Sequence, residues 1–126
     1  MGANVISIGT DLVEKNRIEK LWDRFGDRFA LRILSQEENK VFSELKHPRD
    51  YLAKRYAGKE AVSKVLGTGI GLVRFQEISI LNTDLGKPYV TLSGNAADVA
   101  HKLGIREILI SLSDERAYAL AFAIAI

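Results

Sequence analysis

A carboxylate and an ammonium group lie one helical turn apart in the middle of the chain, at Glu60 and Lys64. On a helix, residues i and i+4 share one face, so the two side chains would point the same way. The glycine-rich stretch 67–71 follows, and a second carboxylate, Asp11, comes after a short apolar segment near the N-terminus. Two carboxylates and an ammonium beside a glycine turn can hold a metal ion and a phosphate.

Glu60 and Lys64 have a simpler interpretation as a surface ion pair worth a few tenths of a kcal/mol. A helical wheel disfavours it, because it places both charges among Ala53, Tyr56 and Ala57. Small apolar neighbours indicate a partly enclosed face, where unpartnered charges are costly. A metal ion or a phosphate would supply the missing partner.

Asp11 and the glycine stretch each have two interpretations. Asp11 and Glu14 match a capping box, so Asp11 either caps a following helix or binds a metal, and a helix N-terminus also attracts phosphate. The stretch 67–71 lacks the Lys-Ser/Thr ending of a P-loop, so it is either a helix end with a flexible connection or part of a phosphate site.

These residues need helices and strands to position them. In the first half of the chain, the pattern of apolar residues predicts a strand over 4–10 and a helix over about 12–34 that breaks near Gly26. A capping box at Ser35 and Glu38 predicts a short helix to about residue 45, and a longer helix over 50–66 should stop at Gly67. The second half predicts these elements: strand 77–81, turn 82–88, strand 89–92, helix 95–103, strand 107–113 and strand 117–126.

The last predicted strand has two unlike faces. Large residues alternate with alanines from Ala117 to Ile126. We expect the large face in a core, because side chains on one face of a strand bury together. The alanine face would let another backbone approach closely, either a helix of the same chain, which we expect, or a second subunit.

Basic residues recur at helical spacing in the first predicted helix, at Arg17, Lys20, Arg24 and Arg28. They are either a solvated face mixed with acidic residues or a docking surface for an acidic partner. A basic helix also permits an alternative function, a non-catalytic phosphate- or RNA-binding module.

The composition limits the function classes. The chain has 126 residues, which suits a single domain over 1–126, and 47% of them are apolar. It has no cysteine, no signal peptide and no apolar run near the length of a membrane span, which favours the cytoplasm. The net charge of +2 does not indicate nucleic acid, and His47 and His101 have no chelating spacing.

Two motifs together resemble a known family. Residues 8–11 (Ile-Gly-Thr-Asp) and 59–64 (Lys-Glu-Ala-Val-Ser-Lys) are similar to the two-part signature of the 4′-phosphopantetheinyl transferases. The chain length, the glycine stretch 67–71 and residues 85–88 (Leu-Gly-Lys-Pro) resemble the small bacterial holo-acyl-carrier-protein synthases in particular. Two positions depart from the family pattern: Tyr56 replaces a frequent Trp or Phe, and Asp114 stands where many members have His.

The resemblance implies an α+β fold, with an antiparallel sheet packed against helices, and a homotrimer with active sites between subunits. It implies transfer of phosphopantetheine from coenzyme A to a serine of an acyl carrier protein, releasing adenosine 3′,5′-bisphosphate. Mg²⁺ would be held by Asp11 and Glu60, and Lys64 would neutralise the departing phosphate. The serine proton would go to a metal-bound water or to Glu60.

The resemblance also implies the binding residues. Coenzyme A would contact the following residues: Arg55, Lys59, Lys64, Gly67, Gly86, Lys87 and Pro88. Acyl carrier proteins are acidic, so Arg17 and Arg24 of the basic helix would dock one. Neither nucleic acid nor a membrane is expected as a partner.

Overall fold

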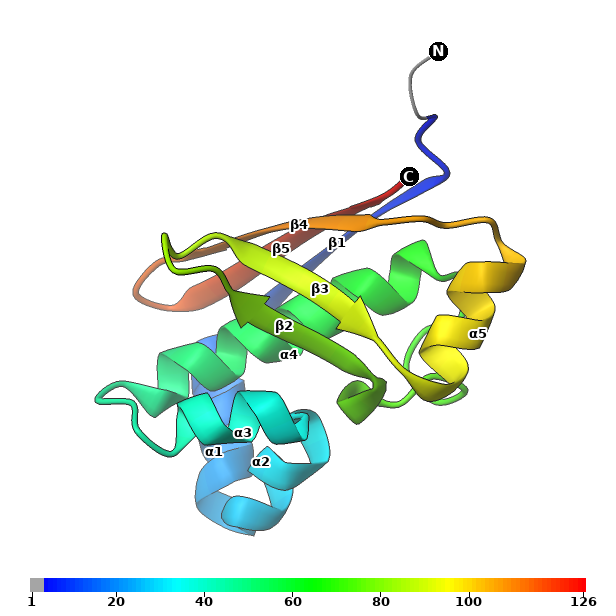
Figure 1. Ribbon diagram of the computed structural model, residues 1–126. Coiled ribbons are helices and arrows are strands. Elements are labelled where there is room, and N and C mark those ends of the chain that lie inside the picture. Colours follow the sequence, from blue (N-terminus) through cyan, green and yellow to red (C-terminus); the bar gives the residue numbers. More distant parts are fainter. Residues whose placement is uncertain (1–3) are drawn as a thin grey trace.

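The computed structural model describes residues 4–126 as an α+β fold in which a long helix, α4, lies between an antiparallel sheet and smaller helices (Figure 1). The first half contains β1 (Ser7–Glu14), α1 (Lys15–Phe25), α2 (Asp27–Ile33), α3 (Gln36–Phe42) and α4 (Pro48–Val65). The second half contains a 3₁₀ turn (Phe75–Glu77), β2 (Ile78–Asn82), β3 (Pro88–Leu92), α5 (Gly94–Lys102), β4 (Ile108–Asp114) and β5 (Tyr118–Ala125). The predicted α+β fold class is confirmed, and the elements match the predicted ones closely except at the first strand, predicted over 4–10, and at the first helix.

The main sheet has the strand order β1-β5-β4 with antiparallel pairing throughout. The alanines of β5 from Ala119 to Ala125 are fully buried because α4 packs across this face of the sheet. The expectation that the alanine face covers a helix of the same chain is therefore confirmed. Alanine permits the close approach because its side chain adds almost no thickness to the strand.

The opposite face of the same sheet corrects a prediction. Large residues of β5 were expected in a core, but Tyr118, Leu120 and Phe122 are each at least a third exposed. Ile8 and Leu12 of β1 lie opposite Ile124 and Leu120 and are 62% and 61% exposed. The large side chains face outward because α4 has room only for the alanines, so the sheet presents an apolar outer surface.

The first helix starts later than predicted. The chain stays extended to Glu14 because β1 pairs with β5 over its whole length, from Ser7 opposite Ala125 to Glu14 opposite Tyr118. Alternating burial along β1, with Val13 buried, is the pattern of a half-covered strand. Asp11 therefore lies inside a strand, and the capping-box interpretation of Asp11 is wrong.

The remaining helices begin and end for local reasons. The predicted capping box is confirmed: Ser35 accepts a hydrogen bond from the Glu38 N–H, and Glu38 accepts one from the Ser35 N–H. Gly26 separates α1 from α2. Its φ of 62° lies in the left-handed region, which glycine adopts more readily than other residues. After α4, Gly67 has a φ of 75° and donates its N–H to the Lys64 carbonyl, as the predicted stop requires.

Strands β2 and β3 form an antiparallel hairpin beside β4, and α5 packs at the end of the hairpin (Figure 1). Buried apolar side chains from both halves of the chain join in one cluster around α4. Residues 4–126 contain no helix with the length and apolar character that crossing a bilayer requires.

Candidate functional site

Strand β1 is fastened along the C-terminal half of α4 by close backbone contacts. A Cβ built on Gly9 would lie 2.5 Å from the Ala61 carbonyl oxygen and 2.9 Å from the Lys64 Cβ, so only glycine fits there. The Ser7 hydroxyl donates to the Val65 carbonyl at 2.6 Å. Lys64 Nζ donates to the Thr10 carbonyl at 2.6 Å. These contacts hold the residue that follows Thr10 against α4.

That residue is Asp11, and its side chain is on the face of β1 that α4 covers, 18% exposed. Lys64 Nζ lies 3.4 Å from Asp11 Oδ1. Burial raises the pKa of Asp11 despite the Lys64 ammonium. Burial, together with the negative charge of Asp11, also raises the pKa of Glu60, so the two carboxylates repel each other electrostatically. The structure thus brings together Asp11, Glu60 and Lys64, although 48 residues lie between the first two in the sequence.

Arg17 of α1 adds a second positive charge to this cluster. Its Nη2 donates to the Tyr56 hydroxyl at 3.5 Å, and its guanidinium carbon lies 5.7 Å from the Tyr56 ring centroid. Its charge acts on both carboxylates and lowers the pKa of each, against the larger effect of burial. Tyr56 is held from the other side by Phe75, with ring centroids 5.2 Å apart. Sequence reasoning placed Arg17 on the first helix but did not foresee that it faces the carboxylates.

The cluster suits a divalent cation that takes only part of its coordination from protein. Within residues 4–126, no group of three or more His, Cys, Asp and Glu side chains could hold a metal ion. A closed structural site is therefore absent from the described chain. Two half-buried carboxylates with unfavourable mutual repulsion fit Mg²⁺, which is usually held by one or two carboxylates with phosphates and waters.

Lys59 does not fit its predicted contact with coenzyme A. Its ammonium group is fully buried and donates to Glu38 Oε1, to the Ile33 carbonyl and to the Phe75 carbonyl. An ammonium group has three donors, so none remains for a phosphate. Glu38 completes the network by accepting from the Ile80 N–H at 2.8 Å. Lys59 therefore ties α4 to the other helices and β2.

Arg55 links α4 to the hairpin turn that carries Gly86, Lys87 and Pro88. Its Nε donates to the Ile80 carbonyl at 3.0 Å and its Nη2 to Asn82 Oδ1 at 2.6 Å. Asn82 in turn donates to the Gly86 carbonyl at 2.9 Å. Arg55 is only 3% exposed, so its first role here is structural.

The predicted coenzyme A residues therefore form two separate groups. Lys64 and Gly67 lie at the C-terminal end of α4, whereas the hairpin turn lies toward its N-terminal end (Figure 1). With 18 residues, α4 is about 27 Å long, so one protomer does not bring these groups into a single small site.

Asp114, where many family members have His, belongs to a salt-bridge network. Lys15 Nζ lies 2.7 Å from Asp114 Oδ2 and 3.0 Å from Asp50 Oδ1, and Lys54 Nζ lies 3.6 Å from Asp114 Oδ1. The network joins the end of β4 to the starts of α1 and α4. Sequence spacing gave no signal of it, because its members come from three distant segments.

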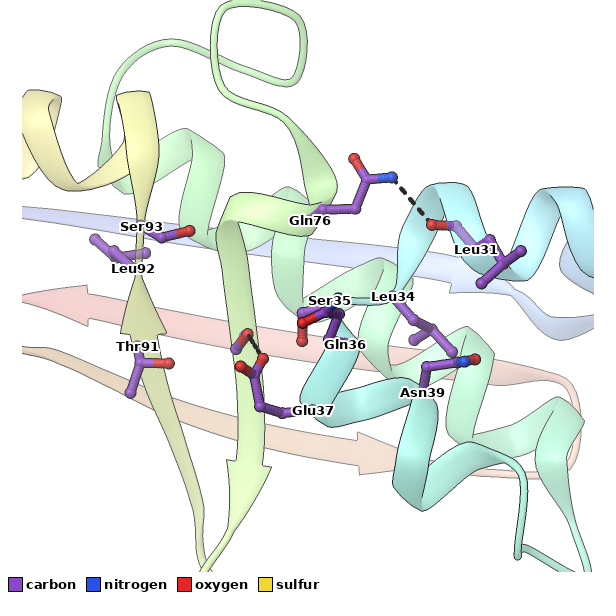
Figure 2. Close-up of a pocket in the computed structure, with 11 residues that line it drawn as sticks. Leu31, Leu34, Ser35, Gln36, Glu37, Asn39, Gln76, Thr91, Leu92 and Ser93 are labelled. Atoms are coloured by element: carbon purple, nitrogen blue, oxygen red, sulfur yellow. Dashed lines mark hydrogen bonds between the residues drawn. The ribbon is translucent and has the colours of Figure 1, made fainter.

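Two pockets are relevant to ligand binding. A pocket of about 450 Å³ between α1, α2 and α4 has Tyr56 in its wall, next to the carboxylates. Its lining is apolar apart from two cationic residues: Leu21, Phe25, Arg28, Phe29, Arg32, Ile33, Tyr56 and Phe75. A second pocket, of about 440 Å³, lies between α3 and the β2–β3 hairpin (Figure 2). Its lining includes Ser35, Glu37 and Thr91 and none of the predicted site residues. The first pocket contains none of them either, but Tyr56 in its wall lies one helical turn before Glu60 on α4.

Comparisons with known proteins agree with the motifs and the fold. Residues 7–123 match the model of the 4′-phosphopantetheinyl transferase superfamily. A holo-[acyl-carrier-protein] synthase of Vibrio vulnificus (strain CMCP6) is 50% identical over 121 residues, which cover 95% of this chain and 96% of that protein.

Solved structures give the same result. The crystal structure of holo-[acyl-carrier-protein] synthase from Neisseria meningitidis superposes with a TM-score of 0.92 at 42% identity, covering 98% of this chain and 99% of that one. The Helicobacter pylori synthase, solved in complex with coenzyme A, has a TM-score of 0.84 at 31% identity, covering 95% of this chain and 100% of that one. The likeness thus extends over nearly the full length of each protein.

Proposed function

Because the chain belongs to the 4′-phosphopantetheinyl transferase superfamily, we propose that it transfers the 4′-phosphopantetheine group of coenzyme A to a serine hydroxyl of apo-acyl carrier protein. Adenosine 3′,5′-bisphosphate is the second product. The observation that carries the proposal is the meeting of Asp11, Glu60 and Lys64 at the contact between β1 and α4. We also propose that this reaction takes place in the cytoplasm.

The cluster supports a division of roles among these three residues. Asp11 and Glu60 would hold Mg²⁺, which would supply positive charge at the pyrophosphate of coenzyme A. Lys64 is 52% exposed and adjoins the Gly67 loop, so its ammonium can contact the phosphate that leaves. Catalysis of phosphoryl transfer rests on positioning and charge neutralisation, and these residues provide both.

The basic face of α1 supports docking of the acidic carrier protein. Arg17 and Arg24 are two turns apart and both are exposed. Arg17 lies at the carboxylate cluster, and Arg24 stacks on the exposed ring of Phe25, with 5.1 Å between the guanidinium carbon and the ring centroid. The apolar pocket beside Tyr56 is lined in part by Leu21 and Phe25 of the same helix.

A homotrimer is part of this proposal. The outward face of the main sheet exposes a contiguous set of large apolar side chains: Ile8, Leu12, Leu109, Tyr118, Leu120 and Phe122. A patch of this kind marks an interaction surface. Association through this face would also let two protomers share one coenzyme A site. The hairpin turn of one protomer, together with its Arg55, would complete the site of the next protomer. That turn carries Gly86, Lys87 and Pro88.

A transfer assay tests the function directly. The protein is mixed with coenzyme A, Mg²⁺ and an apo-acyl carrier protein, and mass spectrometry detects the added arm. We expect modification by the wild type, and loss of it in Asp11→Ala and Glu60→Ala, whose circular dichroism should be unchanged. Arg106→Ala, two residues before β4 and outside the predicted site, serves as a control that should keep full activity.

Two results would count against the proposal. Full Mg²⁺-dependent activity of either carboxylate variant would refute the metal assignment. Salt-sensitive RNA binding by a wild type that modifies no carrier would favour the non-catalytic binding module instead.

A further inference from the structure

Arg17 lies between the proposed metal site at Asp11 and Glu60 and the basic face of α1 that is proposed to dock the carrier. Its guanidinium contacts Tyr56, which lies one helical turn before Glu60 on α4. Arg17 is also exposed and belongs to the basic face of α1. The charges that shift the pKa values of both carboxylates include that of Arg17. One side chain is therefore within electrostatic reach of the metal site and of an approaching partner.

The attachment of Arg17 to the site is loose. Its hydrogen bond to the Tyr56 hydroxyl is long, at 3.5 Å, and exposed, and its ring contact is at 5.7 Å. An exposed contact of this kind contributes little free energy, so a modest electrostatic change can move the side chain. Without a bound cation, the two carboxylates attract the guanidinium. Beside a bound divalent cation, the guanidinium is repelled and favours a carboxylate of the partner.

We propose that Arg17 couples divalent-cation binding at Asp11 and Glu60 to carrier docking on α1, so that each event tightens the other. The inference rests on the proposed function, and it concerns regulation of the same site. A carrier carboxylate that pairs with Arg17 removes a positive charge from the vicinity of the cation. Thermodynamic reciprocity then requires the cation to strengthen carrier binding by the same factor.

Arg24 provides a matched control on the same helix. It lies two turns from Arg17 and is also exposed, but it stacks on Phe25. The cationic groups that act on Asp11 and Glu60 are Lys64 and Arg17. Loss of Arg24 should weaken docking through the lost charge while leaving the coupling to the cation intact.

The experiment measures carrier affinity without turnover. Fluorescence anisotropy of a labelled apo-acyl carrier protein is recorded without coenzyme A, with and without Mg²⁺, at constant ionic strength. For the wild type, we expect Mg²⁺ to tighten carrier binding by about fivefold, at the lower end of ordinary coupling between sites. The coupling ratio is the carrier Kd without Mg²⁺ divided by the carrier Kd with Mg²⁺. In Arg17→Gln this ratio should fall to about one. Arg24→Gln should bind the carrier more weakly and keep the wild-type ratio.

Calorimetric titration with Mg²⁺ gives a second readout that needs no carrier. Arg17→Gln should bind Mg²⁺ more tightly than the wild type, because a repelling charge is gone, and Arg24→Gln should match the wild type. A wild-type ratio of one, or a full ratio retained in Arg17→Gln, would overturn the coupling. If the wild type still modifies the carrier in the transfer assay, only the coupling fails; if it neither binds nor modifies a carrier, the proposed function fails with it.

Discussion

At the scale of single residues, the same residue type serves opposite purposes in α4. Lys59 is fully buried and uses all three of its ammonium donors inside the protein, whereas Lys64 is half exposed beside Asp11. Burial lowers the pKa of Lys59, and the adjacent Glu38 carboxylate opposes that shift. Both lysines belong to the motif 59–64, but Lys59 stabilises the fold and Lys64 belongs to the candidate site.

Asp114 allows a test at this scale. Hydrogen bonding from Lys15 holds the pKa of Asp114 below its usual value of 3.8. A depressed folded-state pKa stabilises the fold above the unfolded-state pKa, and this stabilisation is lost as the pH falls through the folded-state value. We expect Asp114→Asn to lower the free energy of unfolding by about 1 kcal/mol at pH 7, since the pair is partly exposed.

Urea unfolding between pH 7 and pH 2.5 measures this difference. The difference in the free energy of unfolding between the wild type and Asp114→Asn should be constant near neutral pH. It should become smaller below about pH 3.8. Asp98→Asn, at an exposed position of α5, should show no gap. A gap that persists undiminished at the lowest pH would rule out the ion pair as its cause.

At the scale of elements, the site depends on how closely β1 approaches α4. Gly9 has no side chain to hold the two elements apart, and Ser7 and Lys64 bridge them by hydrogen bonds at 2.6 Å. The buried alanine face of β5 allows the same helix to lie flat on the sheet. The contact between two elements, rather than either element alone, sets the distance between Asp11 and Glu60.

Gly9→Ala should therefore damage both stability and activity. The new methyl group would clash with the backbone of Ala61 and with the Lys64 Cβ, and overpacking of this kind costs about 1–3 kcal/mol. Thermal unfolding should show a lowered Tm, and the transfer rate of the folded fraction should fall because Asp11 moves off Glu60. A variant with reduced Tm but an unchanged transfer rate would show that the spacing is not critical.

At the scale of the whole molecule, the main sheet is covered on one face only. The covered face meets α4, and the outer face carries exposed apolar residues on β1, β4 and β5. The two groups of predicted coenzyme A residues lie toward opposite ends of α4 in one protomer. Both features are accounted for if copies of the chain associate through the outer face.

Leu120→Asp tests that association, because Leu120 lies opposite Leu12 at the middle of the outer face. A charge there should be costly to bury between subunits, so the variant should sediment as a monomer and lose transfer activity while keeping its circular dichroism. Leu103, which directly follows α5, is similarly exposed, so Leu103→Asp should keep the assembly of the wild type. A monomeric wild type with full activity would contradict the trimer.

The sequence by itself determined the fold class, most of the elements and the identity of the two carboxylates. Capping boxes, glycine stops and alternation are local signals. They correctly predicted the helix start at Ser35, the helix end at Gly67 and the existence of the last strand, but not which face of that strand is buried. The motifs around Asp11 and Glu60 were also visible because each is contiguous in the chain.

Only the tertiary structure decided which residues meet. It extended β1 through Asp11, because pairing with β5 outweighed the local capping pattern. It turned the large face of β5 outward, committed Lys59 to a buried network and set Arg17 beside the carboxylates. Each of these outcomes depends on contacts between segments far apart in the chain, and such contacts leave no trace in local spacing.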